Sequence, residues 1–269
     1  MPRLGFDDDI ALRQDGSAYH GAVAEGWETP RGPLGGYVMA IVLHGMQLAV
    51  GDDGRQPRSL TVHFLRPPRP GPVTVLPTVE RAGRSLSSVT ARLEQDGKPI
   101  ALATGAFSAP WESPALGDVP PPEVDPPDPA RPAIGDLPQD RPRPAFTSRM
   151  TMQPRFGDPP FSGSEHGLVG GWLGLTERRP IDAATIVVLA DAWFPSPWPR
   201  LSELAPAPTI DLTVHFRAPL PLPDGVLLGR FASRLVRDGF FDEDGELWSE
   251  DGTLVAQSRQ LGLLIDPKA

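Results

Sequence analysis

One carboxylate in this sequence has the type and the setting to activate a water molecule. Asp191 directly follows Ile181–Ala190, an apolar run that predicts a helix. The dipole of a helix disfavours an anion at its C-terminal end, so a plain solvated role explains this aspartate poorly. We therefore favour a functional or networked role for Asp191, and a carboxylate there could act as a general base that takes a proton from a water.

Histidines offer a second possible base. His63 and His215 each lie in the pentapeptide LTVHF, which occurs at residues 60–64 and again at residues 212–216. Because both copies hold the histidine inside an apolar strand-like run, we favour a structural role for the pair. We interpret His44, in an apolar predicted helix, as a core or interface histidine.

Composition excludes several kinds of catalytic site. The chain of 269 residues has no cysteine, so it holds no cysteine nucleophile, disulfide or zinc–thiolate site. It lacks the G-x-S-x-G pattern of serine hydrolases, and its five histidines are too scattered to form a metal-ligand set. We therefore expect no metal, no cofactor and no covalent acyl-enzyme.

The balance of charge restricts the partners. A formal net charge of −9 argues against a nucleic-acid surface, which needs a basic stripe. A small polyanionic ligand held by a few arginines stays possible. The arginines that could meet its phosphates are mostly interpreted as ordinary surface charges: Arg66, Arg69, Arg81, Arg84 and Arg217.

The chain shows no sign of export or membrane insertion. Residues Met1–Ile10 are poor in apolar side chains and contain three consecutive aspartates, unlike a signal peptide. The longest apolar run, Tyr37–Leu43, is too short to span a bilayer. We expect a cytoplasmic protein without a membrane partner, and the abundance of arginine, proline and alanine hints at a GC-rich bacterial genome.

The two copies of LTVHF belong to a longer duplication. They lie 152 residues apart (212 − 60), and other features recur at similar offsets. Trp27 and Trp172 are 145 apart, as are the apolar helical runs Ala40–Leu43 and Thr185–Val188, while the turns Asp96–Gly97 and Asp251–Gly252 are 155 apart. Loop insertions would cause such a drift in offset. We interpret the chain as one unit duplicated in tandem, the covalent form of a two-fold homodimer.

Each predicted unit contains one apolar helix and several strands. The first helix, Tyr37–Val50, is apolar on nearly every side and too short for a membrane, so it requires a sheet around it. After the first helix we expect strands at residues 59–65, 73–81, 85–95 and 100–108. Two strands, at residues 150–154 and 167–175, precede the second predicted helix, Ile181–Ala190. Four more follow it, at residues 209–216, 226–235, 240–249 and 253–264. A helix followed by consecutive antiparallel strands is an α+β layout.

We place the first unit at residues 1–109 and the second at residues 145–269. The connection between them, residues 110–144, contains 12 of the 35 prolines. Such a composition predicts an irregular, partly extended segment that lies along the surface and joins the units.

The order of these features resembles the double hotdog fold, and more specifically the type II acyl-CoA thioesterase family. The resemblance is carried by Gly35-Gly36, Leu189-Ala190-Asp191, Phe194-Pro195, Thr209-Ile210-Asp211, His215-Phe216-Arg217, Pro219, Gly252, Leu254-Val255-Ala256, Gln260 and Gly262. It covers nearly the whole chain apart from the proline-rich connection. It implies a tandem double hotdog, in which each unit is an antiparallel sheet wrapped around a central apolar helix, and an acyl-CoA-type substrate.

The resemblance also implies which side chains hold the attacking water. In that family these are an aspartate, a threonine and a glutamine, and by position they are Asp191, Thr209 and Gln260. The repeat offsets give their equivalents in the first unit: Met46 (191 − 145), Pro57 (209 − 152) and Gly105 (260 − 155). Since these three lack the required groups, we expect one working site per chain.

The chemistry is coherent for thioester hydrolysis by direct attack of water. Asp191 would accept the proton, while hydrogen bonds from Thr209 and Gln260 would fix the position of the water. Backbone N–H groups of Gly35 and Gly36, at the start of the first helix, would stabilise the charge on the thioester oxygen.

Alternatives remain for several of these residues. The glutamine could be Gln257, which lies three residues from Gln260. Thr213 or Asp211 could take the place assigned to Thr209. Gly35 and Gly36 could be only a tight turn into the helix.

Two other functions remain open as well. A hotdog dehydratase or hydratase would need a histidine–carboxylate pair, and a non-catalytic acyl-CoA-binding or assembly protein would bind without turnover. Exposed strand edges favour pairing, so we expect a homodimer or a higher homo-oligomer. The acyl group and its carrier, CoA or acyl carrier protein, stay open.

Overall fold

The computed structural model describes residues 5–114, 116–117, 119–128 and 143–265, and the structural statements below concern these residues. The helices are α1 (Phe6–Asp9), α2 (Gly35–Val50), η1 (Ala145–Arg149), α3 (Ala183–Leu189) and η2 (Trp198–Arg200). The strands of the first half are β1 (Arg13–Asp15), β2 (Ala18–Val23), β3 (Glu28–Thr29), β4 (Gly32–Pro33), β5 (Gln56–Phe64), β6 (Gly71–Ala82), β7 (Leu86–Gln95) and β8 (Lys98–Ser108). Those of the second half are β9 (Met150–Gly157), β10 (Gly167–Leu175), β11 (Thr209–Phe216), β12 (Leu227–Ser233), β13 (Val236–Arg237), β14 (Phe240–Trp248) and β15 (Leu254–Leu263).

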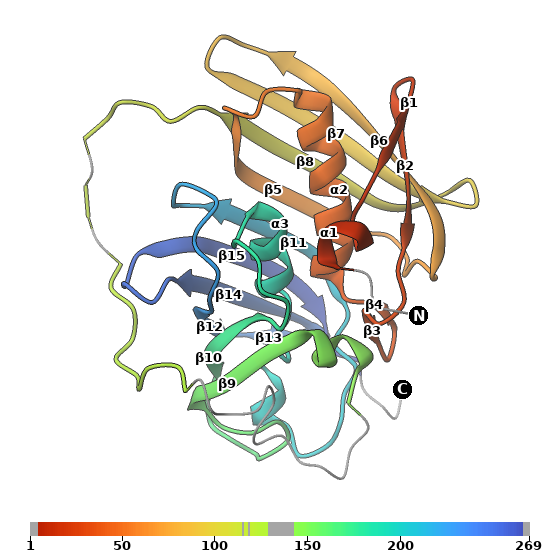
Figure 1. Ribbon diagram of the computed structural model, residues 1–269. Helices are drawn as coiled ribbons and strands as arrows, with labels where there is room; N and C mark the ends of the chain where they lie inside the picture. The colour runs from red at the N-terminus through yellow and green to blue at the C-terminus, as the bar shows by residue number, and fades with distance from the viewer. Residues whose placement is uncertain (1–4, 115, 118, 129–142, 266–269) are drawn as a thin grey trace.

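One large antiparallel sheet runs through the whole molecule (Figure 1). Its strands lie in the order β1-β2-β6-β7-β8-β5-β11-β15-β14-β12-β10-β9, with β13 beside β14, and β3 pairs with β4 separately. Counted outward from the junction of β5 and β11, each half adds five strands in a matching order. The predicted α+β class is confirmed, and the duplication is visible as an internal symmetry of the sheet.

The two copies of LTVHF form the centre of this symmetry. They lie in β5 and β11, which pair with each other antiparallel, and Thr61 lies opposite Thr213. The two hydroxyl oxygens are 2.9 Å apart and share a hydrogen bond. Since Thr213 is also the repeat equivalent of Thr61 (213 − 152), the approximate two-fold axis passes between these two side chains.

Not every sequence match survives as a structural equivalence. The alignment of Trp27 with Trp172 is wrong, because β2 and β10 hold equivalent places in the sheet order and Trp27 lies beyond β2 while Trp172 lies within β10. Trp27 is buried in the main core, whereas Trp172 belongs to a second apolar cluster with Leu228 and Trp248. The similar offset of the two tryptophans therefore has no structural basis.

The sheet encloses the predicted apolar helices. Residues 36–43 of α2 are fully buried, and this helix packs mainly against α3, β6 and β7. The predicted enclosure of α2 by a sheet is confirmed. The second helix is shorter than expected: α3 starts at Ala183, where Asp182 caps it, and ends at Leu189, after which the N–H groups of Asp191 and Ala192 bond three residues back in tighter turns.

Gly36 allows α2 and α3 to touch. A Cβ atom at this position would lie 2.5 Å from the carbonyl oxygen of Val187 and 2.8 Å from the Cα of Val188, both in α3. These are backbone atoms, which cannot move aside as the end of a flexible side chain can. Only glycine therefore fits at the contact between the two helices.

Part of the proline-rich connection is docked on the sheet. The indole N–H of Trp248 donates to the carbonyl of Val119, and that of Trp172 donates to the carbonyl of Asp125, each at 2.8 Å. Val124 packs on the second apolar cluster. Residues 129–142 of the connection lie outside the described residues, and the unit boundaries at 109 and 145 stay predictions.

We expect Gly36→Ala to lower the free energy of unfolding by about 1–3 kcal/mol, because the added methyl group overlaps the α3 backbone. Denaturant unfolding followed by circular dichroism measures this loss. Gly225→Ala is the matched control, since the nearest atom to its added Cβ is a side-chain oxygen of Glu250 at 3.4 Å. Equal stability of the two variants would contradict the close helix contact.

Candidate active site

The structure brings two of the predicted site residues together directly. Thr209 is the first residue of β11 and Gln260 lies in the neighbouring strand β15. The Thr209 hydroxyl donates to Gln260 Oε1 at 3.0 Å. Gln260 is buried, and it is this glutamine, not Gln257, that reaches Thr209.

Asp191 lies just beyond α3, where it meets the start of α2. The backbone N–H of Gly36 donates to Asp191 Oδ2 at 2.7 Å. Leu34, the N-cap residue of α2, has no side chain that can cap the helix, so the carboxylate from the second unit provides the cap. The positive end of the α2 dipole thereby favours the anion that the end of α3 would disfavour.

The surroundings tune this carboxyl toward base chemistry. The pKa of Asp191 is raised to about 7, mainly by burial and also by the charge of Glu243, while hydrogen bonds from the backbone N–H groups of Gly36 and Gly35 act in the opposite direction. A general base works best when its pKa lies near the working pH. Asp191 can therefore exchange a proton with water near neutral pH.

Gly35 and Gly36 hold Asp191 in this structure. The Gly36 N–H is engaged by the carboxylate rather than facing an open space. A Cβ atom on Gly35 would lie 2.9 Å from Asp191 Oδ2 and 3.1 Å from Cζ of Phe64. The absence of a side chain thus leaves room beside the carboxylate, and the role of these glycines in holding a substrate oxygen stays a prediction.

Sequence reasoning missed a fourth polar residue of this site, Glu243. Its side chain is 6% exposed in β14. Gln260 Nε2 donates to Glu243 Oε1 at 2.7 Å, and the backbone N–H of Ser196 donates to Glu243 Oε2 at 2.6 Å. Burial raises the pKa of Glu243. The sequence pattern that could have revealed this residue is the alternation of side chains along a strand, which places Glu243 on the same face as the buried Phe241 and Leu247.

The equivalent place in the first unit is filled by apolar atoms. In the paired strands, Leu60 faces Gly105 in the register in which Leu212 faces Gln260. A Cβ atom on Gly105 would lie 2.9 Å from the terminal methyl of Met46. This arrangement agrees with the offsets that align Met46 with Asp191 and Gly105 with Gln260.

The repeated histidines lie on the two strands that join the halves of the sheet. His63 and His215 are both exposed, and the structural role expected for them stays a prediction. Nδ1 of His63 is 4.0 Å from Oδ2 of Asp211, across the junction of β5 and β11. His44 is half-buried on α2, and burial lowers the pKa of its imidazole.

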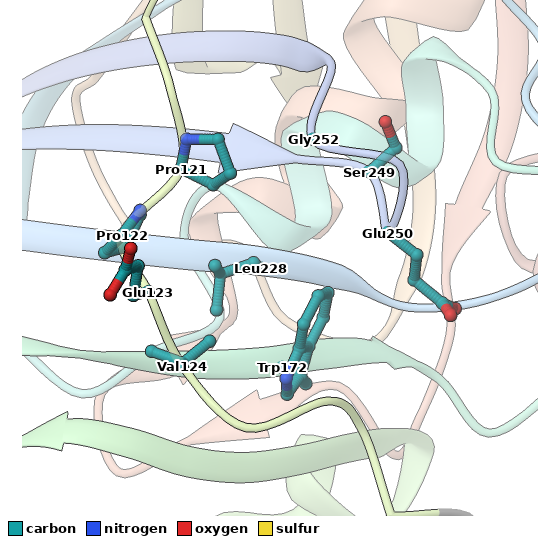
Figure 2. Close-up of a pocket in the computed structure, with 9 residues that line it drawn as sticks. All are labelled: Pro121, Pro122, Glu123, Val124, Trp172, Leu228, Ser249, Glu250 and Gly252. Carbon is teal, nitrogen blue, oxygen red and sulfur yellow. The ribbon is translucent and has the colours of Figure 1, made fainter.

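A surface pocket of about 220 Å³ lies elsewhere, between the connection and the second half of the sheet (Figure 2). Pro121, Pro122 and Val124 line it from the connection, with Trp172 and Leu228 on the sheet side. It is smaller than most ligand pockets and lacks the residues described above. We therefore assign this pocket to the docking of the connection and not to the chemistry.

Two further observations bear on the kinds of site expected. In the part of the chain that the structure describes, no three or more His, Asp or Glu side chains gather as a metal-binding group. Within those same residues, no helix is both long and apolar enough to cross a membrane.

Replacement of Asp191 by asparagine separates its charge from its capping role. In the folded protein the pKa of Asp191 is about 7, above the ordinary 3.8, so this carboxyl lowers the free energy of unfolding of the wild type as the pH rises from about 4 to about 7. Asn cannot ionise and still accepts from Gly36. We expect Asp191→Asn to be at least as stable as wild type at pH 8, with the difference shrinking toward pH 5.

The matched variant is Asp191→Ala, which leaves α2 without its cap. We expect it to be less stable than Asp191→Asn by about 1 kcal/mol at either pH. Urea unfolding at pH 5 and pH 8 measures both effects. A wild-type protein that is clearly more stable than Asp191→Asn at pH 8 would contradict the raised pKa.

Comparison with known families gives the same picture for both halves. Residues 23–108 match the family described as the acyl-CoA thioesterase N-terminal domain. Residues 118–264 match the acyl-CoA thioesterase C-terminal domain. No curated protein sequence matches the chain significantly.

Solved structures share the fold over nearly the full length. A hot dog fold protein of unknown function from Alicyclobacillus acidocaldarius is 29% identical with a TM-score of 0.85, over 97% of this chain and 98% of its own. A proposed thioesterase II from Thermobifida fusca YX is 27% identical with a TM-score of 0.79, over 96% and 98%. The acyl-CoA thioesterase II TesB2 from Mycobacterium marinum, at 20% identity, a TM-score of 0.76 and 98% and 99% coverage, shows the fold alone.

The two family matches occur in the order of the two halves and together span most of the chain, and the sheet order repeats across the same division. The chain therefore belongs to the acyl-CoA thioesterase family and has its tandem hotdog fold.

Proposed function

We propose that this protein hydrolyses an acyl-CoA thioester by direct attack of a water molecule held at Asp191, Thr209 and Gln260. The observation that carries the proposal is the carboxyl of Asp191, whose pKa is raised to about 7 in a chain of the acyl-CoA thioesterase family. The hydrogen bond between Thr209 and Gln260 supports it, because it gives the site a polar pair with fixed geometry.

In the proposed reaction Asp191 takes one proton from the water as its oxygen attacks the thioester carbon. Thr209 Oγ and the second N–H of Gln260 orient the water, which raises its effective concentration at the carbonyl. The tetrahedral intermediate then collapses as the C–S bond breaks. The thiol sulfur takes up the proton, and the products are a free acid and a free thiol.

The start of α2 supplies the favourable field for the charge that develops on the carbonyl oxygen. Backbone N–H groups and the helix dipole converge there. Gly35 carries no side chain beside Asp191 Oδ2, so a substrate oxygen could approach the helix end closely. This is the role that we propose for Gly35 and Gly36, and in it the Gly36 N–H exchanges its bond to Asp191 for one to the substrate oxygen.

The other candidate functions find less support. A non-catalytic binding protein has no need for a joined Thr209–Gln260 pair or for a carboxyl with a pKa near 7. A dehydratase or hydratase would use a histidine–carboxylate pair, and here the exposed His63 lies beside the half-buried Asp211 at the sheet junction. A cytoplasmic location and a homodimer or higher homo-oligomer stay part of the proposal.

Thiol release from a panel of acyl-CoAs tests the function. We expect wild-type turnover of at least one member and a fall in kcat of about 100-fold or more in Asp191→Asn, which keeps the fold and loses the base. Because the base acts when deprotonated, kcat/KM should rise with pH and level off above about 7.

Asp224→Asn serves as the control, since Asp224 is exposed and pairs with Arg178 on the surface. Full activity of Asp191→Asn would place the base elsewhere. Binding of acyl-CoA without any turnover by the wild type would favour the binding protein instead.

A further inference from the structure

We propose that Glu243 is a positioning residue of this site, which fixes the direction of the Gln260 amide and anchors the segment that follows Asp191. Neither the family resemblance nor the three predicted residues includes this carboxylate. The inference rests on the proposed function, because the orientation of Gln260 affects the rate only if the water that Gln260 holds is the nucleophile.

The hydrogen bonds form one directed chain. Thr209 donates its hydroxyl proton to Gln260 Oε1, and Gln260 Nε2 donates to Glu243 Oε1. An amide has one accepting end and one donating end. Both Glu243 oxygens accept, one from the Ser196 N–H and the other from Gln260 Nε2, so the NH₂ end of Gln260 faces Glu243 and its oxygen end faces Thr209.

This direction decides what the site offers to a water molecule. With its proton directed to Gln260, the Thr209 oxygen presents lone pairs. The second N–H of Gln260 Nε2 stays available as a donor, while Asp191 accepts. A water between these groups would donate to Asp191 and Thr209 and accept from Gln260, which leaves its remaining lone pair for the attack.

The other oxygen of Glu243 reaches the segment after Asp191. Ser196 is fully buried, and its backbone N–H donates to Glu243 Oε2 at 2.6 Å. Pro195 and Pro197 on either side have no N–H to donate, so the Ser196 N–H is the backbone donor at this point of the segment. One carboxylate thereby links the neighbourhood of Asp191 to Gln260.

Burial of the Glu243 carboxylate does not by itself favour folding. A buried charge destabilises the folded protein unless hydrogen bonds compensate for the lost water. The strand registers pair Val89 with Gly105 as they pair Glu243 with Gln260, so the first unit carries valine at the equivalent position. A hotdog unit therefore folds with an apolar side chain at this place.

The equivalent positions change together between the two units. Each of these polar residues of the second unit has an apolar or small residue at the equivalent position of the first unit: Met46 for Asp191, Pro57 for Thr209, Val89 for Glu243 and Gly105 for Gln260. A purely structural carboxylate would have no reason to follow this pattern. Its occurrence with the other three argues that it serves the same reaction.

Glu243→Gln distinguishes positioning from simple anchoring. The new amide can still accept from the Ser196 N–H and can donate to Gln260 Oε1, after which Gln260 Nε2 donates to Thr209. Every buried group then keeps a partner, but the direction of the chain is reversed. A structural anchor would tolerate this change, whereas a positioning residue would not.

We expect Glu243→Gln to lower kcat about 10- to 100-fold with KM within about twofold, since the altered groups hold the water and not the acyl group. The thermal midpoint should stay close to wild type. Removal of the charge of Glu243 should also move the acid limb of the pH–rate profile to lower pH, because that charge raises the pKa of Asp191.

The control is Glu246→Gln, in the same strand but half-buried beside Arg230, with which Glu246 forms an ion pair. Wild-type kcat and pH profile in Glu243→Gln would overturn the proposal. If that variant does not fold, Glu243→Val decides in its place, because the first unit folds with valine there. A folded Glu243→Val with wild-type kcat would equally overturn it.

The same assay separates this inference from the proposed function. If the wild-type protein releases no thiol from any acyl-CoA, both the proposed function and the role of Glu243 are wrong. If the wild type is active and activity is lost in Asp191→Asn but not in Glu243→Gln, the proposed function holds and only the role of Glu243 is wrong.

Discussion

The hydrogen bond from Gly36 to Asp191 joins the two halves of the protein at the point where the chemistry is proposed. It requires a glycine, because the backbone of α3 lies within 2.5 Å of any Cβ at that position. It also requires an anion, since α2 has no capping side chain of its own. The contact therefore sets the distance between the helices and the location of the candidate base at once.

The tandem fold makes this contact occur only once. At the start of α3, Asp182 accepts from the N–H of Thr185, so that helix caps itself and needs no carboxylate from the other half. In the first unit the matching interior is closed by Met46 against Gly105. The symmetry of the sheet is close to complete, while the polar residues break it on one side.

Much of the fold could be predicted from sequence because its signals are local. The repeated pentapeptide indicated the duplication, and the apolar stretch in α2 required a surrounding sheet. Glu243 was not predicted from the sequence because it lies between Asp242 and Asp244, and such an acidic run is typical of a solvent-exposed segment. The cap on α2 and the docking of the connection by two tryptophans depend on contacts between distant segments, which one sequence does not reveal.

The pairing of Thr61 with Thr213 at the centre of the sheet has an evolutionary consequence. In a homodimer built from one gene, each substitution appears twice, so a buried carboxylate would burden both subunits. Once two copies are fused in one chain, each side of the axis can change alone. One half can then keep valine and methionine as a stable scaffold, while the other carries the electrostatic cost of two acidic groups in its interior.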